Sequence, residues 1–250
     1  MSKRLRIFAG PNGSGKSTLV DLISNLKINL GVYVNADEIN KTLIENNGID
    51  FGNYGLQLNF EDLTESLIKT SFYTLVEGLE IIRSLTFQND NCLNIINEVE
   101  TEKFSSFLSD YIRFQLLKDN CERISFETVM SHPSKLDFIK TAKANGYKVY
   151  LYFVSLENPI MNVERVNARV QLGGHDVPED KIISRYKRTM ELLLDAIKLV
   201  DRAYFFDNSS ERMRFFAKYQ NKEVLYEDEF IPVWFNDYVE NKYSNNINVE

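Results

Sequence analysis

The sequence contains few of the residues that build disulfide-rich or metal-dependent folds. Of its 250 residues, 2 are cysteine, 2 are histidine and 1 is tryptophan. Cys92 and Cys121 are too few for a disulfide framework and lack the spacing of a metal site, so we expect two reduced thiols in a cytoplasmic protein. Stability must then come from a hydrophobic core, and the chain is long enough to bury one.

Long apolar runs and an excess of positive charge are also missing. No segment approaches the 18 apolar residues of a membrane span, and the basic start MSKRLRIFAG is not followed by the apolar run of a signal peptide. The formal net charge is −7, which disfavours a protein that holds nucleic acid over its whole surface. We therefore expect no membrane partner, and a nucleic-acid partner is disfavoured, although this net charge is still compatible with a local basic cleft. The contents of 44% hydrophobic and 26% charged residues are typical of a globular chain.

Short β-rich runs alternate with segments of helical period. The expected strands are Leu5–Ala9, Val32–Asn35, Ile124–Thr128, Tyr147–Val154 and Ala203–Phe206. This alternation predicts an α/β fold in which helices cover a mostly parallel sheet. We expect one domain over residues 1–250, with a C-terminal extension over about 209–250 that holds a small hairpin and a short helix.

The segment of about residues 45–120 is far longer than one crossover between neighbouring strands requires. In it, Ile68, Phe72, Leu75, Leu79 and Ile82 recur at helical spacing, and residues 104–117 also have a helical pattern. The sequence therefore predicts a helical insertion between the second and third strands, with one amphipathic helix through residues 68–82.

The first strand leads directly into a phosphate-binding motif. The motif is Gly10, Pro11, Asn12, Gly13, Ser14, Gly15, Lys16, Ser17 and Thr18, which fits G-x-x-x-x-G-K-[ST]. The glycines let the backbone N–H groups approach a phosphate, and the following helix adds its positive N-terminal end. Lys16 is expected to reach the β- and γ-phosphates of ATP, and the Ser17 hydroxyl is expected to bind Mg²⁺.

A carboxylate pair follows the second strand, at the sheet edge where open α/β sheets bind ligands. Asp37 is expected to accept a proton from an acceptor hydroxyl or to orient it, with Glu38 beside it in the substrate site. The alternative is that Asp37 or Glu38 only caps the next helix.

Glu127 and Thr128 end the third strand and are the second pair of candidate substrate residues. Glu127 is suited to hold a metal-bound water or a substrate hydroxyl. The alternative is a buried structural glutamate paired with a lysine.

Residues of about 165–185 have the pattern of a lid. Arg165 and Arg169 share one helix face, Gly173-Gly174 ends that helix, and Pro178 starts the next, which carries Arg185. Arg169 and Arg185 are the candidates to clamp the transferring phosphoryl group, with His175 as a substitute for the second arginine. The alternative is a solvated charged face.

Taken together, these motifs resemble the zeta-toxin-like P-loop kinases, and more closely a branch of bacterial predicted ATPases in that superfamily. The segments that carry the resemblance are the P-loop, Asn35–Ile39, Phe126–Val129 and Gly173–Pro178, and it extends over residues 4–42 and 104–208. It implies a three-layer sandwich of the P-loop kinase type, with a five-stranded sheet in the order 2-3-1-4-5.

The resemblance also implies an activity, the transfer of a phosphoryl group from ATP to a sugar hydroxyl of UDP-N-acetylglucosamine. The family's catalytic aspartate maps onto Asp37, its P-loop lysine onto Lys16 and its substrate-side glutamate onto Glu127. The family's second lid arginine has no counterpart before Pro178, which puts the acceptor in question more than the phosphoryl transfer.

The sequence therefore predicts a kinase that uses ATP and Mg²⁺ and acts on a small-molecule acceptor. A regulatory ATPase switch that binds a protein partner, and a nucleic-acid 5′-hydroxyl kinase, are the alternatives. No sequence feature indicates an antitoxin-like partner.

The role of Asp37 is testable by a conservative change. If Asp37 is the base, Asp37→Asn retains ATP binding and loses phosphoryl transfer by roughly 10²–10⁴-fold. Asparagine caps a helix nearly as well as aspartate. Full transfer by the variant, measured with labelled ATP, therefore rejects the base role.

Overall fold

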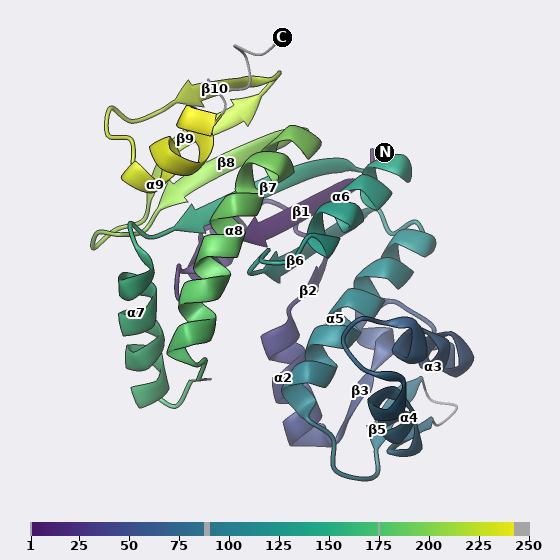
Figure 1. The fold of residues 1–250 in the computed structure, drawn as a ribbon. Helices are drawn as coiled ribbons and strands as arrows, with labels where there is room; N and C mark the ends of the chain where they lie inside the picture. Colours follow the sequence, from purple (N-terminus) through teal and green to yellow (C-terminus); the bar gives the residue numbers. More distant parts are fainter. Residues whose placement is uncertain (1, 88–90, 175, 243–250) are drawn as a thin grey trace. The chain divides into compact units, whose positions relative to one another are not determined.

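The computed structural model describes residues 2–87, 91–174 and 176–242 (Figure 1). The chain divides into two compact units, which are described separately below. The first unit is Met1–Leu30 with Ser125–Glu250, and the second unit is Gly31–Ile124. The single domain expected from the sequence stays a prediction.

The first unit carries the P-loop and most of the central sheet. Its elements are β1 (Arg4–Ala9), α1 (Lys16–Asn25), β6 (Arg123–Thr128, which begins at the end of the second unit), α6 (Ser134–Ala144), β7 (Lys148–Ser155), α7 (Pro159–Gln171), α8 (Glu179–Leu199), β8 (Arg202–Asp207), β9 (Arg214–Gln220), β10 (Glu223–Tyr226), α9 (Val233–Phe235) and the π-helical turn η2 (Asn236–Glu240).

The central sheet has seven strands in the order β10-β9-β8-β7-β1-β6-β2. β1 pairs in parallel with β7, and β7 with β8, whereas β9 and β10 run antiparallel. The five strands expected from the sequence appear in the implied order 2-3-1-4-5, but the expected total of five is wrong. The C-terminal hairpin continues the same sheet because β9 pairs with β8, which would otherwise expose an unpaired edge.

Helices α6 and α8 cross the sheet in front of β1 and β7 (Figure 1). The sequence places the start and the end of α7 and the start of α8 correctly. Asn158 caps α7 by accepting hydrogen bonds from two backbone N–H groups, and Pro178 precedes α8. Gly173, between the two helices, has a φ of 82°, which glycine adopts without strain.

An aromatic cluster joins the C-terminal segment to β7, β8 and β9. Its members are Phe153, Phe205, Phe216, Trp234 and Phe235, each at most 1% exposed. The ring centroids of Phe216 and Trp234 are 5.5 Å apart, and those of Phe205 and Phe235 are 4.8 Å apart. The cluster therefore holds the residues after β10 against the sheet.

The second unit combines helices with a small three-stranded sheet. Its elements are β2 (Val32–Val34), α2 (Ala36–Asn46), β3 (Gly48–Asp50), the 3₁₀ turn η1 (Phe51–Tyr54), α3 (Phe60–Lys69), α4 (Leu75–Arg83), β4 (Leu85–Phe87), β5 (Cys92–Ile95) and α5 (Thr101–Lys118). β3, β5 and β4 form an antiparallel sheet in that order. The helical insertion expected here thus contains three strands that the sequence analysis missed.

The prediction of one amphipathic helix through residues 68–82 is wrong. The chain leaves the helical conformation after α3, and Thr74 starts α4 through a capping box with Glu77. Ile68, Leu75 and Leu79, expected to be buried, are 40%, 57% and 39% exposed. The local capping signal outweighed the apolar periodicity because it satisfies backbone N–H groups at a new helix start.

Among the residues that the structure describes, no helix is long and apolar enough to cross a membrane.

The aromatic cluster makes a prediction about stability. Phe216 is fully buried, so Phe216→Ala is expected to lower the free energy of unfolding by about 3–5 kcal/mol. Its neighbour Phe215 is 38% exposed, and Phe215→Ala is the matched control with a much smaller loss. Urea unfolding followed by circular dichroism measures both, and equal losses would contradict the packing described here.

Candidate functional site

The P-loop occupies the turn between β1 and α1. Gly13 and Gly15 adopt φ values of 72° and 96°, in the left-handed region that residues with a Cβ avoid. Gly15 is the residue directly before α1, so the loop delivers its N–H groups to the positive end of that helix. The glycines of the motif therefore have the conformational role that the sequence predicts.

The Lys16 ammonium lies across the loop. Its Nζ donates hydrogen bonds to the carbonyl oxygens of Gly10 and Pro11, each at 3.1 Å. This geometry keeps a positive charge beside the backbone N–H groups of the loop. It is suited to phosphate oxygens, because both the charge and the donors attract them.

Ser17 and Glu127 come together from two distant parts of the chain. The Ser17 hydroxyl donates to the Glu127 carboxylate at 3.3 Å between Oγ and Oε2. A hydroxyl and a carboxylate oxygen are ligands that Mg²⁺ accepts, directly or through water. The residues present therefore fit the predicted ion, and Glu127 lies beside Ser17, the residue that follows Lys16 in the motif.

Thr128 connects β6 to the loop. Its carbonyl accepts a hydrogen bond from the Gly10 N–H at 3.3 Å, and its hydroxyl accepts one from the Met130 N–H at 3.0 Å. These bonds give Thr128 a structural role at the base of the loop. Its predicted contact with substrate stays a prediction.

Two asparagines that the sequence analysis did not assign to the P-loop hold its outer side. Asn162 on α7 donates from Nδ2 to the Asn12 carbonyl at 2.6 Å. Asn208, directly after β8, donates from Nδ2 to the Ser14 carbonyl at 2.9 Å. No motif marks either asparagine, because their partners are main-chain atoms 150 and 194 residues away in sequence.

The lid arginines take different positions. Arg165 donates from Nη2 to the Asn208 carbonyl at 2.6 Å, beside the loop. Arg169 is exposed one turn further along α7, and Arg185 is partly buried on α8. His175 lies outside the described residues. The predicted approach of Arg169 and Arg185 to a phosphoryl group stays a prediction.

Asp37 and Glu38 lie in the second unit, in the first turn of α2 and exposed to solvent. The cap of α2 is Asn35, whose Oδ1 accepts the Asp37 N–H at 2.9 Å. The alternative that Asp37 or Glu38 is the capping residue is therefore wrong. Burial, and after it the negative charge of Glu38, raise the pKa of Tyr54.

The comparisons with known proteins define what this chain is similar to. No family model matches it. An uncharacterised protein of Haemophilus influenzae is 38% identical over 60 residues, which make up 24% of this chain and 43% of that protein.

Solved structures align over much more of the chain. A chain of the AvrRxo1-ORF1:AvrRxo1-ORF2 complex with sulphate ions aligns with a TM-score of 0.53 and 17% identity, over 91% of this chain and 62% of its own. The complex with ATP aligns with a TM-score of 0.53 and 16% identity, over 90% of this chain and 61% of its own.

These similarities show a shared α/β fold with a mostly parallel central sheet. The present chain spans less than two thirds of the AvrRxo1 chain and less than half of the Haemophilus influenzae protein. Membership of the zeta-toxin-like kinases stays a prediction.

The loop geometry can be tested with two glycines. A Cβ on Gly15 would collide with the Asn208 side-chain amide, whereas a Cβ on Gly146, which also has a positive φ, meets nothing within 4 Å. Gly15→Ala is expected to distort the loop and to weaken ATP binding by about tenfold or more. A loss of only ~1.4 kcal/mol in binding free energy lowers the affinity tenfold. Gly146→Ala should cost stability alone; calorimetric titration with ATP separates the two, and unchanged affinity in Gly15→Ala would contradict the loop assignment.

Proposed function

We propose that the chain is an ATP-dependent phosphotransferase that moves the γ-phosphoryl group of ATP to a hydroxyl of a small molecule. The observation that carries this proposal is the combination of Lys16 lying across a glycine-shaped loop with the Ser17–Glu127 pair beside it. A structural turn requires neither a lysine over the loop nor a hydroxyl–carboxylate pair at its end. A fold shared with a protein solved in complex with ATP supports the same conclusion.

Each of these residues has a defined role in the proposed reaction. The loop N–H groups and Lys16 hold the β- and γ-phosphates, and Ser17 with Glu127 would hold Mg²⁺, which neutralises charge on the phosphate oxygens when bound. Asp37 takes the proton of the acceptor hydroxyl, whose oxygen bonds to the γ-phosphorus while the bond to the β-phosphate oxygen breaks and ADP leaves. Arg169 and Arg185 are the proposed cations that meet the developing charge.

For the acceptor, we propose a nucleotide sugar such as UDP-N-acetylglucosamine. The support is the resemblance of Asn35–Ile39 and Phe126–Val129 to the zeta-toxin-like kinases. A free sugar or another metabolite with a hydroxyl fits the same chemistry, so the test includes them.

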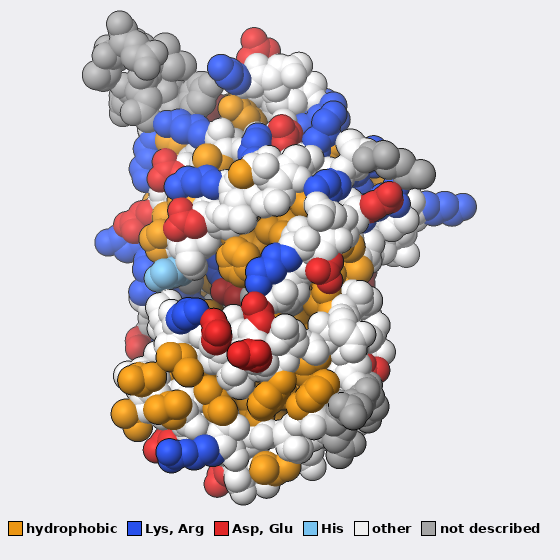
Figure 2. All heavy atoms as spheres, turned by 90° about the vertical axis from the view of Figure 1, so that its right-hand side faces the viewer, with side chains coloured by type: hydrophobic (Ala, Val, Ile, Leu, Met, Phe, Trp, Pro, Cys, Tyr) orange, Lys and Arg blue, Asp and Glu red, His pale blue; other side chains and the backbone are white. Residues whose placement is uncertain are grey.

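A regulatory ATPase that binds a protein partner is the second candidate. Leu75 and Val76 on α4 are 57% and 66% exposed. Exposed apolar side chains of this kind favour a protein contact at α4. The 5′-hydroxyl kinase is less well supported, because on the face drawn in Figure 2 the Lys and Arg side chains are interspersed with Asp and Glu rather than gathered into one basic track.

The deciding experiment is transfer from γ-labelled ATP to a panel of nucleotide sugars, sugars and short oligonucleotides. The kinase proposal expects label on a small-molecule acceptor. Label only on free phosphate, with no product across the panel, would support the ATPase instead, and label on an oligonucleotide 5′-hydroxyl would support the nucleic-acid kinase.

Lys16→Ala is the matched loss-of-function variant. Removing the ammonium is expected to abolish transfer and to weaken ATP binding, because a point charge on the β- and γ-phosphates is lost. Calorimetric titration and the labelled-ATP assay measure the two effects. Near wild-type affinity and turnover in this variant would show that the loop does not hold the triphosphate.

A further inference from the structure

One face of the central sheet carries aromatic side chains that α6 and α8 do not cover. Side chains alternate between the two faces along a strand, and α8 and Trp234 pack on the face of Phe153 and Ser155. Tyr152 and Tyr204 therefore point to the opposite face, which is turned away from the viewer in Figure 1.

The rings on this face form a stack that continues from strand to strand. The ring centroids of Phe8 and Tyr152 lie 5.0 Å apart, and those of Tyr152 and Tyr204 also lie 5.0 Å apart. Phe215 on β9 follows, 6.3 Å from Tyr204. Phe8 and Tyr152 are buried where α1 contacts β1 and β7, whereas Phe215 is 38% exposed. The stack thus has a covered end at β1 and an open end at β9, where another flat ring can be added.

Positive charges lie beside these rings on the same face. The pairing of the parallel strands places Arg6, Tyr150 and Arg202 side by side, and the Arg6 guanidinium lies 5.9 Å from the centre of the Tyr150 ring. Arg4 and Lys148 form the next pair toward the starts of the strands, and both are exposed. On β1, β7 and β8, which the structure describes in full, no acidic side chain shares this face.

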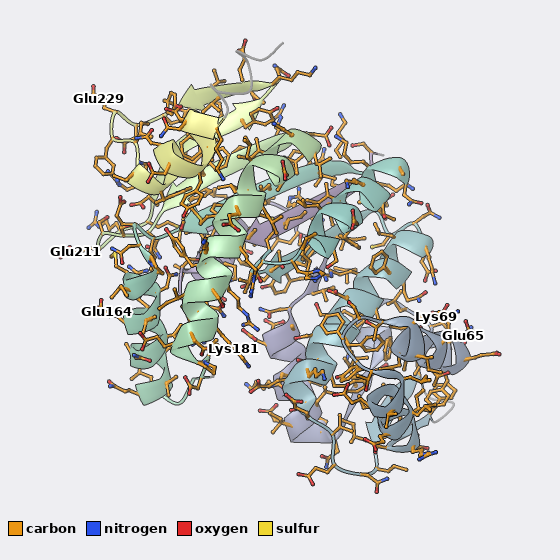
Figure 3. The ribbon with its side chains drawn as sticks, viewed as in Figure 1. Glu65, Lys69, Glu164, Lys181, Glu211 and Glu229 are labelled. Carbon is orange, nitrogen blue, oxygen red and sulfur yellow. The ribbon has the colours of Figure 1, made fainter. Side chains whose placement is uncertain are left out.

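The acidic residues of this part of the chain lie at the edge hairpin. Glu227 binds Lys218 of β9, and Glu223 is on the edge strand β10. Figure 3 shows Glu211 and Glu229 at the end of the hairpin where β8 leads to β9 and β10 leads to α9, which is the opposite end of β8 from its first residue, Arg202. The positive charge is therefore concentrated where β1, β7 and β8 begin.

Arg6 also has a buried donor that lacks an acceptor. Its side chain is 5% exposed, and its Nη1 has no hydrogen-bond partner among the described residues. A buried charged donor in this state lowers stability unless an acceptor reaches it. A phosphate lying over Tyr150, between Arg6 and Arg202, would supply an acceptor oxygen of the complementary charge.

We propose that this basic aromatic face binds single-stranded nucleic acid, with the backbone phosphates on the cations and a base against Phe215. The face is defined by Arg4, Arg6, Lys148, Tyr150, Arg202, Tyr204 and Phe215. Unpaired bases stack on aromatic side chains while cations follow the backbone, and a protein binds RNA or DNA in this way without reading its sequence. An acidic peptide would use the cations and leave the open end of the ring stack without a partner.

The basic aromatic face is separate from the P-loop. Asn208, which directly follows β8, contacts the loop at Ser14. Arg202 is at the other end of β8, about 20 Å away at 3.3 Å per residue. The nucleic acid is thus a second ligand rather than the phosphoryl acceptor, so the inference goes beyond the proposed function. The net charge of −7 conceals this face, because its cations alternate with other residues on strands that are far apart in sequence.

Fluorescence anisotropy with labelled oligonucleotides tests the proposal. The probes are oligo-U and oligo-dT of about 10 nucleotides, within the usual site sizes of single-strand platforms. A 5′-fluorescein label removes the hydroxyl that a 5′-kinase would use. The wild-type protein is expected to bind at least one probe with a Kd of about 10⁻⁶–10⁻⁴ M at physiological salt, and the preferred probe identifies the sugar.

Two variants separate the ring from the charge. Phe215→Ala is expected to weaken binding by about tenfold, the size of one lost base–ring stack, and to leave the salt dependence unchanged. Arg202→Ala should weaken binding and reduce the slope of log K against log salt by about 0.7, the value for one phosphate on a single strand. A merely structural role of either residue would not produce this split. If Phe215→Ala does not fold, the slope of Arg202→Ala decides.

Matched controls remove similar groups from other surfaces. Phe230 is 51% exposed and lies over Arg214, which pairs with Asp207 on the opposite face. Lys140 is an exposed cation on α6. Phe230→Ala, Lys140→Ala and the P-loop variant Lys16→Ala should all bind the probes as the wild type does.

Four outcomes overturn the inference. They are no binding of either probe up to about 10⁻³ M protein, beyond the range of weak nucleic-acid contacts, and unchanged probe affinity in Phe215→Ala. The others are equally tight binding of a labelled polyglutamate peptide, which would assign the face to an acidic protein, and loss of probe binding with Lys16→Ala or with ATP, which would place the probe at the P-loop. Transfer from labelled ATP decides the proposed function independently of all four.

Discussion

The candidate site depends on one backbone conformation, that of the turn between β1 and α1. Gly13 and Gly15 have positive φ there, which costs a residue with a Cβ about 1–2 kcal/mol and which glycine adopts freely. The carbonyls of Asn12 and Ser14 are taken up by Asn162 and Asn208. These two side-chain hydrogen bonds from distant segments hold the loop in this conformation.

The C-terminal hairpin and the helical turn after it are connected to this loop through β8. β9 pairs with β8, and the aromatic cluster with Trp234 packs the segment after β10 onto it. Trp234 also donates to the buried Asp207, which directly precedes Asn208. A segment without any motif of its own therefore takes part in holding the P-loop.

The second unit contains the candidate base, Asp37, in the first turn of α2. Asn35 caps α2 and thereby leaves the Asp37 side chain out of the capping interaction. Exposed apolar residues on α3 and α4 belong to the same unit. The proposed catalytic base and a candidate protein-binding face thus lie in the same compact unit.

The sequence by itself determined the features that depend on local physics. The glycines and Lys16 define the P-loop, Asn158 and Pro178 define the starts of α7 and α8, and the apolar runs define five strands of the sheet. These signals are strong because each reflects a backbone preference or a capping bond formed within a few residues. The P-loop motif also identifies Ser17 as a candidate Mg²⁺ ligand, although the motif does not contain its hydrogen-bond partner.

Only the tertiary structure decided which distant residues meet. Glu127 reaches Ser17 across 110 positions, and Asn208 reaches Ser14 across 194. The break between α3 and α4, the small sheet of the second unit and the extension of the central sheet to seven strands were likewise missed. Apolar periodicity says that a face can be buried, whereas strand pairing and side-chain contacts with main-chain atoms depend on how the whole chain packs.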